Sequence, residues 1–519
     1  MRTSSQLRPK RTIAAVAAAV ALTLGVTACG GTTDPGTDPT DGAVSNATLT
    51  LAIQAPPPSL DPAQLDEGTG TFIWSSVFDT LLKVDNEGKI VANAAEAWEY
   101  SEDLLTLTLT LREGLTFSDG DAVTAQDVAD TLNRTRETPG QQQPKLSSVE
   151  SVEAPDDRTV VLTLSQPDPV LVNYLAQATG VIGDPEVLDD PESALRPVGS
   201  GPYELSDATV DGTSYVLERR DDYWNAEAYP FAKVTVRVIQ DGTAIFNALI
   251  AGELNAANIQ APQLEQAEAS NLQVAQISSA ATILLLMADR EGTIQPALAD
   301  ERVRQAINMA FDRQLYVDKL FAGIAQPTEQ NFNMNGAAYD ASLEGTYPYD
   351  PDKARELLAE AGYADGFTLT MPSTLISQNY EPAITDSLGD IGIKVTCEPV
   401  PPQNIASSLT GGTYAAVVWG EGTNLAGREM ANHFSPNGFL NPFHWQTDEF
   451  DAMLEAIALE RDPDAQAELY KKASGYTVEH ALNAPIASIG ALWATSKDVD
   501  VVTKVNVPKT VRMFAPAGD

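Results

Sequence analysis

Few residues in this sequence have the types and spacing that catalysis requires. The chain contains three histidines, His433, His444 and His480, and no two of them have the spacing of a metal site. Motifs of a nucleophile elbow, a phosphate-binding loop or a zinc protease do not occur. A triad assembled from distant positions keeps a hydrolase open as an alternative. The residues favour a protein that is not an enzyme and that uses neither a metal ion nor a cofactor.

Residues 414–428 carry side chains that suit the binding of a small molecule. Trp419 follows the apolar run 415–418, which predicts a buried strand with the indole at its end. There the ring could stack on a ligand or close a hydrophobic core, and Trp74 offers the same choice. Arg428 could pair with a carboxylate or phosphate, or form a surface salt bridge in an acidic protein.

The N-terminus has the pattern of an export signal. Four basic residues precede the apolar run 13–26, which is too short to span a bilayer comfortably, and small residues follow it. Residues 26–29 (VTAC) look like a lipobox, in which Cys29 becomes the lipidated first residue of the mature protein. We expect a signal peptide over residues 1–28 and lipidation at Cys29; a plain signal peptide is the alternative.

The predicted lipidation at Cys29 also indicates a tether and a location for the protein. Residues 29–45, rich in Gly, Thr, Asp and Pro, predict a flexible tether between the lipid and a folded body. We expect the protein on the outer face of the bacterial cell membrane, held there by its lipid anchor.

The composition is that of an acidic globular protein. The 519 residues include 32 Lys and Arg against 72 Asp and Glu, a net charge of −40, with 43% apolar residues. This length suggests two to four domains, and the apolar fraction excludes bulk disorder. Without a basic stripe, a nucleic-acid partner is excluded. The second cysteine, Cys397, lies in an alternating run and is expected to be a small buried residue.

Strand and helix patterns alternate along the chain without a fixed repeat. Strands are predicted at residues 48–53, 104–112, 158–165, 215–219, 234–239, 283–287, 367–371 and 393–397. Helices are predicted from a capping box at residues 124–127, at 301–310, 312–323, 350–362 and 449–459. The pattern indicates an α/β protein.

From Asp61 onward a series of motifs resembles one family. The motifs are residues 59–62 (SLDP), 77–82 (VFDTLL), 88–98 (GKIVANAAEAW), 111–120 (LREGLTFSDG), 124–128 (TAQDV), 199–203 (GSGPY), 220–224 (RDDYW) and 303–307 (VRQAI). Singly these are strand ends and turns that hold a fold. Jointly, and in this order, they resemble the large solute-binding proteins (family 5) that feed ABC importers for oligopeptides, dipeptides and nickel complexes.

The resemblance implies a two-lobed periplasmic-binding-protein-like clamp that closes over a cleft by hinge motion. It implies a discontinuous lobe I over residues 46–82, 198–287 and 489–519. An extra domain II over residues 83–197 packs on that lobe, and lobe III covers residues 288–488.

The resemblance also implies where a ligand is held. In the family the cleft is lined by the segment after the first strand, here residues 63–74 with Thr71 and Trp74, and by a Trp-containing strand end, here with Trp419 and Arg428. Peptide-binding members carry an Asp three residues after that Trp, which pairs with the peptide's amine. Here that position is Gly422, preceded by Glu421. Either Glu421 serves from a shifted backbone, or the ligand has no amine.

The expected function is therefore capture of a peptide or peptide-like ligand and its delivery to an ABC permease with its ATPase subunits. We expect a monomer. A sugar, an opine or a metal chelate remains open within the same fold; for a chelate, His433 or His444 could be a ligand, although both are predicted to lie in a connecting loop. A lipoprotein that senses a ligand without transport is a further alternative.

Overall fold

The computed structural model describes residues 46–68, 70–321, 323–374, 377–401, 404–436 and 438–518. The predicted signal peptide at 1–28, the lipidation site at Cys29 and the tether at 29–45 lie outside these residues. Among the helices that the structure describes, none is both long enough and apolar enough to cross a bilayer.

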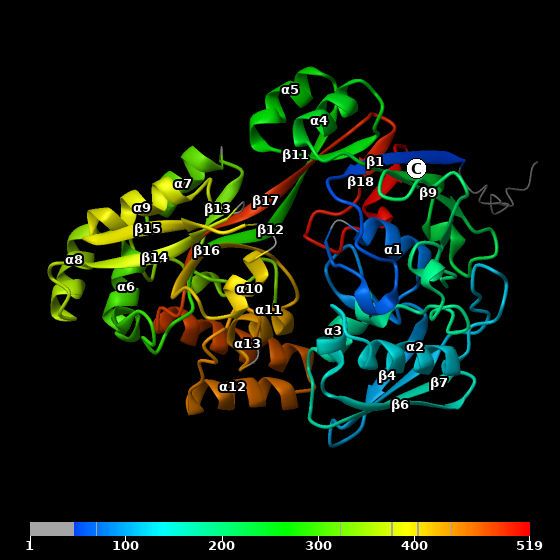
Figure 1. The fold of residues 1–519 in the computed structure, drawn as a ribbon, viewed down its shortest axis with the longest axis horizontal. Helices are drawn as coiled ribbons and strands as arrows, with labels where there is room; N and C mark the ends of the chain where they lie inside the picture. The colour runs from blue at the N-terminus through cyan, green and yellow to red at the C-terminus, as the bar shows by residue number, and fades with distance from the viewer. Residues whose placement is uncertain are drawn as a thin grey trace, which may run out of the picture. The chain divides into compact units, whose positions relative to one another are not determined.

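The largest element is a nine-stranded mixed sheet with the order β16-β12-β17-β11-β1-β10-β9-β8, in which β13 also pairs with β17. Its strands are β1 (Ala47–Ile53), β8 (Tyr203–Leu205), β9 (Ser214–Arg219), β10 (Phe231–Val238), β11 (Ala256–Ile259), β12 (Gln273–Met287), β13 (Ala325–Pro327), β16 (Ala416–Gly422) and β17 (Ala484–Thr495). Two long antiparallel strands, β12 and β17, connect the half of the sheet next to β11 with the half next to β16 (Figure 1).

The other described strands form smaller sheets. In the described part of the chain, a four-stranded antiparallel sheet has the order β4-β5-β7-β6, and three further sheets have two strands each. Their bounds are β2 (Leu82–Val84), β3 (Ile90–Ala92), β4 (Ala95–Tyr100), β5 (Thr106–Leu111), β6 (Val149–Asp156), β7 (Thr159–Leu164), β14 (Phe367–Ser373), β15 (Ile393–Pro399), β18 (Val499–Val501) and β19 (Phe514–Pro516).

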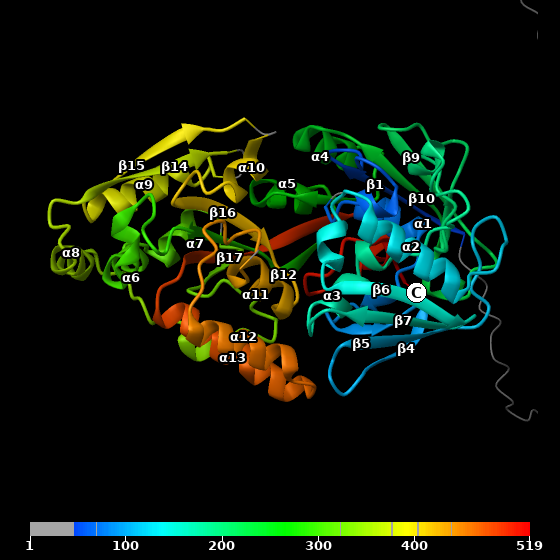
Figure 2. The same cartoon turned by 60° about the horizontal axis from the view of Figure 1, so that its bottom comes forward.

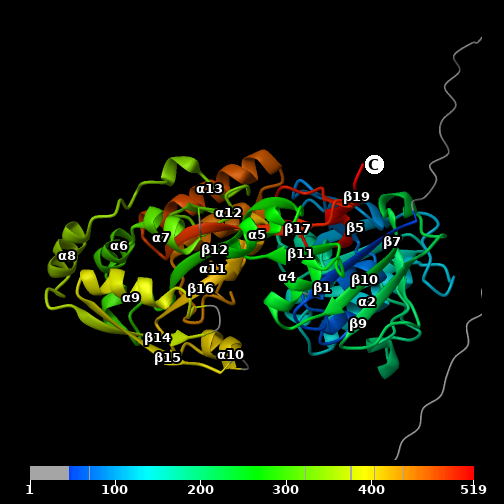
Figure 3. The same cartoon turned by 90° about the horizontal axis from the view of Figure 1, so that it is seen from above.

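The α-helices cover the sheets. They are α1 (Thr71–Val77), α2 (Ala125–Glu137), α3 (Leu171–Leu175), α4 (Gly242–Ile250), α5 (Leu264–Ala269), α6 (Glu301–Met309), α7 (Arg313–Leu320), α8 (Pro351–Glu360), α9 (Glu381–Asp390), α10 (Ile405–Thr410), α11 (Ala426–Phe434), α12 (Asp448–Leu459) and α13 (Pro463–Glu479). Helix α2 packs on β6 and β7 of the four-stranded sheet (Figure 2), and α9 packs on β15 (Figure 3).

The predicted strands and helices are confirmed within a few residues. The capping box that predicted α2 is present, because the Thr124 hydroxyl accepts from the Asp127 N–H while the Asp127 carboxylate accepts from the Thr124 N–H. The sequence predicted only part of β12. The apolar run 283–287 is the end of a 15-residue strand whose first half is polar. Cys397, expected to be buried, is half-buried.

Three large hydrophobic cores lie in the described chain. Core 1 contains Leu49, Phe72, Ile277, Trp493 and Phe514; core 2 contains Ile283, Leu285, Ile307, Leu369 and Ile486; core 3 contains Leu107, Leu109, Leu132, Val160 and Leu162. Strands β12 and β17 each contribute to both core 1 and core 2, so the large sheet is continuous between them.

The pairing of β12 with β17 is interrupted between the two cores. The register shifts between Ile277 and Ala281, and Ser279 within this bulge has φ of +52°. A left-handed conformation is unfavourable for a residue with a Cβ, and here polar contacts hold it. The Ser279 hydroxyl oxygen accepts from the Met334 N–H at 3.2 Å, and the Ser488 hydroxyl lies 3.0 Å from it. The bulge is thus one of two points at which the strands depart from regular pairing, the other being between Ile283 and Leu284.

Candidate ligand-binding site

A cavity of about 520 Å³ lies beside this bulge, and its lining includes Trp74 and Val507 of core 1 and Ala426 of a smaller core. One side, which we call the lysine wall, consists of Thr71, Trp74, Val84, residues 87–89 and residues 505–509. The opposite side, the amide wall, consists of Asn333, residues 335–337 and residues 422–426. Ala280 of the bulge, Glu67, Gln177 and Arg428 lie in the lining between the walls.

The lysine wall is anchored in core 1 through α1. Phe72 and Ile73 of this helix are buried in that core, and Trp74 is only 3% exposed. The Trp74 indole N–H donates to the Asp66 carbonyl oxygen at 2.7 Å, which fixes the ring at the cavity edge. Thr71 at the start of the helix is buried as well. Of the aromatic residues predicted from sequence, Trp74 therefore lies in the lining.

Lys509 is the cation of the lysine wall that has no acidic partner among the described residues. Its side chain is accessible to solvent, yet it lies among protein atoms in the cavity wall. Desolvation by these atoms lowers the pKa of Lys509 below its usual 10.5. Nothing in the sequence around Lys509 distinguished it, because only the fold brings residues 505–509 beside α1.

A buried carboxyl group fixes the amide wall. Glu429 of α11 is 2% exposed and accepts the Asn424 N–H at 2.8 Å and the Asn333 N–H at 3.1 Å. One side chain therefore ties together the two loops that form this wall. Burial raises the pKa of Glu429 to about 8. Sequence reasoning missed this residue, because no sequence pattern predicted the helix α11 that carries it.

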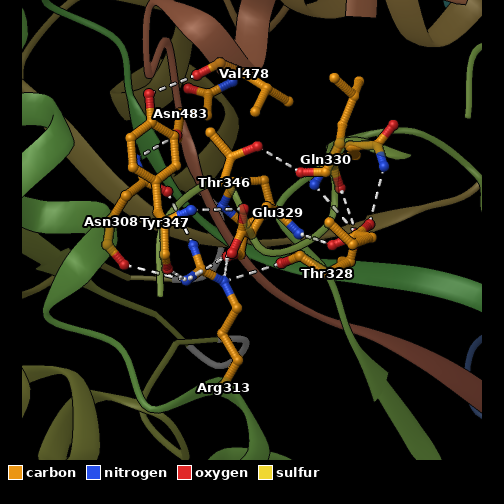
Figure 4. A network of polar contacts seen from close by, with 12 residues as sticks. Asn308, Arg313, Thr328, Glu329, Gln330, Thr346, Tyr347, Val478 and Asn483 are labelled. Carbon is orange, nitrogen blue, oxygen red and sulfur yellow. Dashed lines mark hydrogen bonds and ion pairs between the residues drawn. The ribbon is translucent and has the colours of Figure 1, made fainter. Parts of the chain in front are cut away.

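A second buried network holds the chain that leads to Asn333 (Figure 4). Arg313 donates through Nε to the Thr328 and Pro485 carbonyl oxygens at 3.1 and 2.9 Å, and its Nη1 lies 3.7 Å from the Glu329 carboxylate. The other Glu329 oxygen accepts the Tyr347 N–H at 3.0 Å. This network attaches the segment before Asn333 to β17 and core 2.

Arg428 belongs to an ion cluster that connects three segments distant in sequence. Glu67 pairs with Lys145 at 2.6 Å and with Arg428 at 2.5 Å, and Arg428 also donates to the Gln177 side-chain oxygen at 3.0 Å. Burial raises the pKa of Glu67, but the two cations outweigh it and the net shift is downward. The carboxylate that Arg428 contacts is thus one supplied by the protein.

The remaining predicted residues are divided between the cavity and the sheet behind it. Gly422 lines the cavity. Trp419 and Glu421 are not among its described lining residues. Trp419 packs on Phe439 with ring centroids 6.3 Å apart, and β16 continues three residues beyond it. Glu421 contacts His433 Nε2 and the Asn432 amide.

The predicted loop at His433 is wrong. His433 is fully buried in α11, because this helix packs Met430 and Phe434 into a smaller core with Trp445. In the described part of the chain, no group of three or more His, Cys, Asp or Glu side chains is arranged to hold a metal ion.

These features define an α/β binding protein with a solvent-accessible cavity between walls from separate cores, and comparisons with known proteins agree. The chain belongs to the bacterial extracellular solute-binding proteins, family 5, whose middle-region model matches residues 89–442. The resemblance predicted from sequence is thereby confirmed.

Relatives and solved structures extend the match over most of the chain. The glutathione-binding protein GsiB of Salmonella typhi is 28% identical over 447 residues, which cover 80% of this chain and 84% of the relative. The periplasmic binding protein DppA of Helicobacter pylori, solved with the peptide STSA, has a TM-score of 0.77 at 24% identity and covers 91% of this chain and 98% of its own. AgaA of A. tumefaciens R10, solved with agropinic acid, has a TM-score of 0.76 at 24% identity and covers 91% and 99%. The predicted periplasmic-binding-protein-like fold is confirmed.

Proposed function

We propose that this protein captures a peptide or peptide-like solute in the cavity and delivers it to an ABC importer, without catalysing a reaction. The observation that carries the proposal is a cavity of about 520 Å³ whose two walls come from separate cores, one rich in backbone and amide groups and the other aromatic and cationic. A short peptide offers amides, a carboxylate and side chains that suit such walls. Membership of the family and the name of the GsiB relative support this solute class.

The division into lobes belongs to the same proposal. Lobe I over residues 46–82, 198–287 and 489–519, domain II over residues 83–197 and lobe III over residues 288–488 would each be organised around one of the three large cores. The bulge at residues 278–280 of β12 would act as the hinge, because it interrupts strand pairing between core 1 and core 2. The end of lobe I after this bulge, with Ile283, Leu285 and Met287, would then move with core 2.

Solute binding would then act on a conformational equilibrium. A ligand that touches both walls stabilises the state in which they are close, and that state would present the surface that a permease recognises. Shifting such an equilibrium from mostly open to mostly closed takes about 5 kcal/mol of differential affinity. Ala280 and Thr423 place the cavity directly at the bulge, since the Thr423 hydroxyl contacts the Ser279 carbonyl oxygen.

The experiment is native mass spectrometry of residues 30–519, purified gently from rich medium, followed by release of bound molecules under denaturing conditions. We expect adducts whose released masses sequence as short peptides or peptide-like compounds. A single discrete sugar, opine or metal chelate would overturn the peptide assignment, and turnover of bound peptide would overturn pure binding.

We further propose that Cys29 carries the lipid that holds the protein at the outer face of the cell membrane. The support is the sequence of residues 26–29 after the apolar run 13–26. The Cys29→Ser variant should leave the membrane fraction and lose the mass of the lipid. If the variant stays in the membrane fraction, the anchor is elsewhere.

A further inference from the structure

Lys509 differs from the other cations at the cavity in having its charge uncompensated. Arg428 and Lys145 share Glu67, and Lys89 lies 3.3 Å from Glu87. In the described chain, no acidic side chain lies within ion-pair distance of Lys509. The protein has more than twice as many acidic as basic residues, so a cation left without an acid at a cavity wall is unexpected on composition alone.

We propose that Lys509 binds a carboxylate of the solute and thereby makes this site selective for peptide-like ligands with a free acidic end. The inference rests on the proposed function and names the residue that recognises the negative charge of the solute. It also places the charged contact on the lysine wall, at a residue that sequence reasoning did not select.

The partners of Arg428 explain why it does not take this role. Its guanidinium is committed to Glu67 and Gln177, so pairing with a solute carboxylate would leave the Glu67 carboxylate with Lys145 alone. Breaking a buried pair in this way is costly. Lys509 gives up no ion pair with a described residue when it pairs with a carboxylate, and the pairing stabilises an ammonium group whose charged form is disfavoured by desolvation.

A small adjoining chamber strengthens the attraction for anions. Its volume is about 40 Å³, it shares Trp74, Val84 and Pro508 with the main cavity, and its lining includes Lys83 and Arg512. Burial and next the charge of Arg512 lower the pKa of Lys83, while the charge of Asp79 raises it. With two cations, Lys83 and Arg512, and one acid, Asp79, the lining of the chamber has a net positive charge.

The acid of that chamber, Asp79, is already occupied by protein donors. Its carboxylate accepts from the Tyr223 hydroxyl at 2.7 Å, the Trp224 indole at 2.9 Å and the Asn93 amide at 3.1 Å. The chamber therefore adds to the positive field beside Lys509 without offering Asp79 as a free partner for a solute amine.

The test is calorimetric titration of the wild-type protein and two variants with matched pairs of peptides. The probes are the tetrapeptide STSA and glutathione, each with a free C-terminal carboxylate and as the C-terminal amide. The Lys509→Met variant removes the proposed contact. The Lys504→Met variant removes the same charge five residues earlier, at an exposed side chain outside the cavity lining, and is the matched control.

We expect the wild-type protein and Lys504→Met to prefer the free carboxylate by about ten- to hundredfold, the range of a charge-assisted hydrogen bond. Lys509→Met should lose this preference while it still binds the amides as the wild type does. If the wild type binds the peptides and neither amidation of the peptide nor the Lys509→Met substitution changes the affinity, the inference is overturned and the proposed function stands. If neither peptide binds in either form, the proposed function fails for peptides, and the inference fails with it. Lys509→Arg, which keeps the charge, should retain most of the preference; loss there together with unchanged amide binding would point to shape at Lys509 and contradict a charge contact.

Discussion

The two walls of the cavity use their charged residues in opposite ways. Around the amide wall the ionisable side chains are bonded within the protein: Arg428 pairs with Glu67, Glu421 contacts His433, and Glu429 holds two backbone N–H groups. On the lysine wall, Lys89 lies 3.3 Å from Glu87, but Lys509 has no acidic partner among the described residues. The difference suggests a division of labour in which one wall uses charge to set its own geometry and the other keeps charge for the solute.

Removing the carboxylate of Glu67 is the most severe way to break this comparison. Glu67→Gln leaves Lys145 and Arg428 close together without their shared acid, and both cations are mostly buried. Loss of one partner from a buried ion pair destabilises proteins by about 3–5 kcal/mol, so we expect a decrease near the lower end of that range. Chemical denaturation with urea measures the free energy of unfolding.

Two further variants separate the charge effect from a general loss of contacts. Arg428→Met should cost less than Glu67→Gln, because Glu67 keeps Lys145, and the double variant should cost less than the sum of the two. Glu253→Gln removes an exposed pair with Arg237 and should change stability by no more than about 1 kcal/mol. Equal effects of Glu67→Gln and Glu253→Gln would contradict a structural role for the cluster.

Glu429→Gln tests whether the amide wall contains a carboxyl that is protonated at neutral pH. The folded pKa of about 8 lies above the ordinary value of 4.5, so the stability that protonation contributes is complete below about pH 4.5 and is lost as pH rises toward 8. The slope is at most about 1.4 kcal/mol per pH unit. We expect the unfolding free energy of the variant, relative to wild type, to improve from pH 5 to 8.

The matched control for that series is Glu455→Gln, an exposed glutamate of α12. Its difference from wild type should stay constant over the same pH range. A parallel pH profile of wild type and Glu429→Gln would show that Glu429 is ionised throughout, held charged by the Asn333 and Asn424 N–H groups.

Sequence patterns predicted the fold better than the site for a physical reason. Alternation in β5, the capping box of α2 and the Asp350-Pro351 start of α8 are local, because propensity and capping act between residues a few positions apart. Together with ordered family motifs they were enough for the fold class. Sequence patterns did not predict the polar first half of β12, because its pairing with β17 depends on residues more than 200 positions away.

The site depends on contacts of this long-range kind. Trp74, Thr71, Gly422 and Arg428 were selected from sequence and line the cavity, whereas Trp419 and Glu421 lie outside its described lining. Strand alternation supplies the reason for Glu421, since adjacent residues of β16 point to opposite faces. No local sequence pattern marks Lys509 or Glu429. Lys509 lies at the cavity only because the C-terminal segment folds against it, and Glu429 matters because it holds two loops whose contact residues are 91 positions apart.

The pH dependence of peptide binding tests the role of Lys509 in the lysine wall. The pKa of Lys509 in the free protein lies below 10.5 because of desolvation, and a bound carboxylate should raise it. The advantage of wild type over Lys509→Met in binding STSA should therefore shrink as pH rises from 7 to 10, and binding should take up protons in that range. Calorimetry in buffers of different ionisation enthalpy measures the uptake. An advantage that stays constant would mean that Lys509 does not exchange a proton on binding.

The smallest effect is expected away from both walls, at Arg461 between α12 and α13. Its guanidinium donates to the Ser101 carbonyl oxygen at 2.9 Å and contacts the Glu102 carbonyl oxygen, in an exposed contact with the turn that joins β4 and β5. Arg461→Ala should change the free energy of unfolding by about 0.5 kcal/mol or less, and peptide affinity by less than about twofold. If the affinity instead changed as much as in Lys509→Met, this peripheral contact would take part in the binding equilibrium. Recognition could then no longer be assigned to the difference between the two walls, because a contact distant from both would control the same equilibrium.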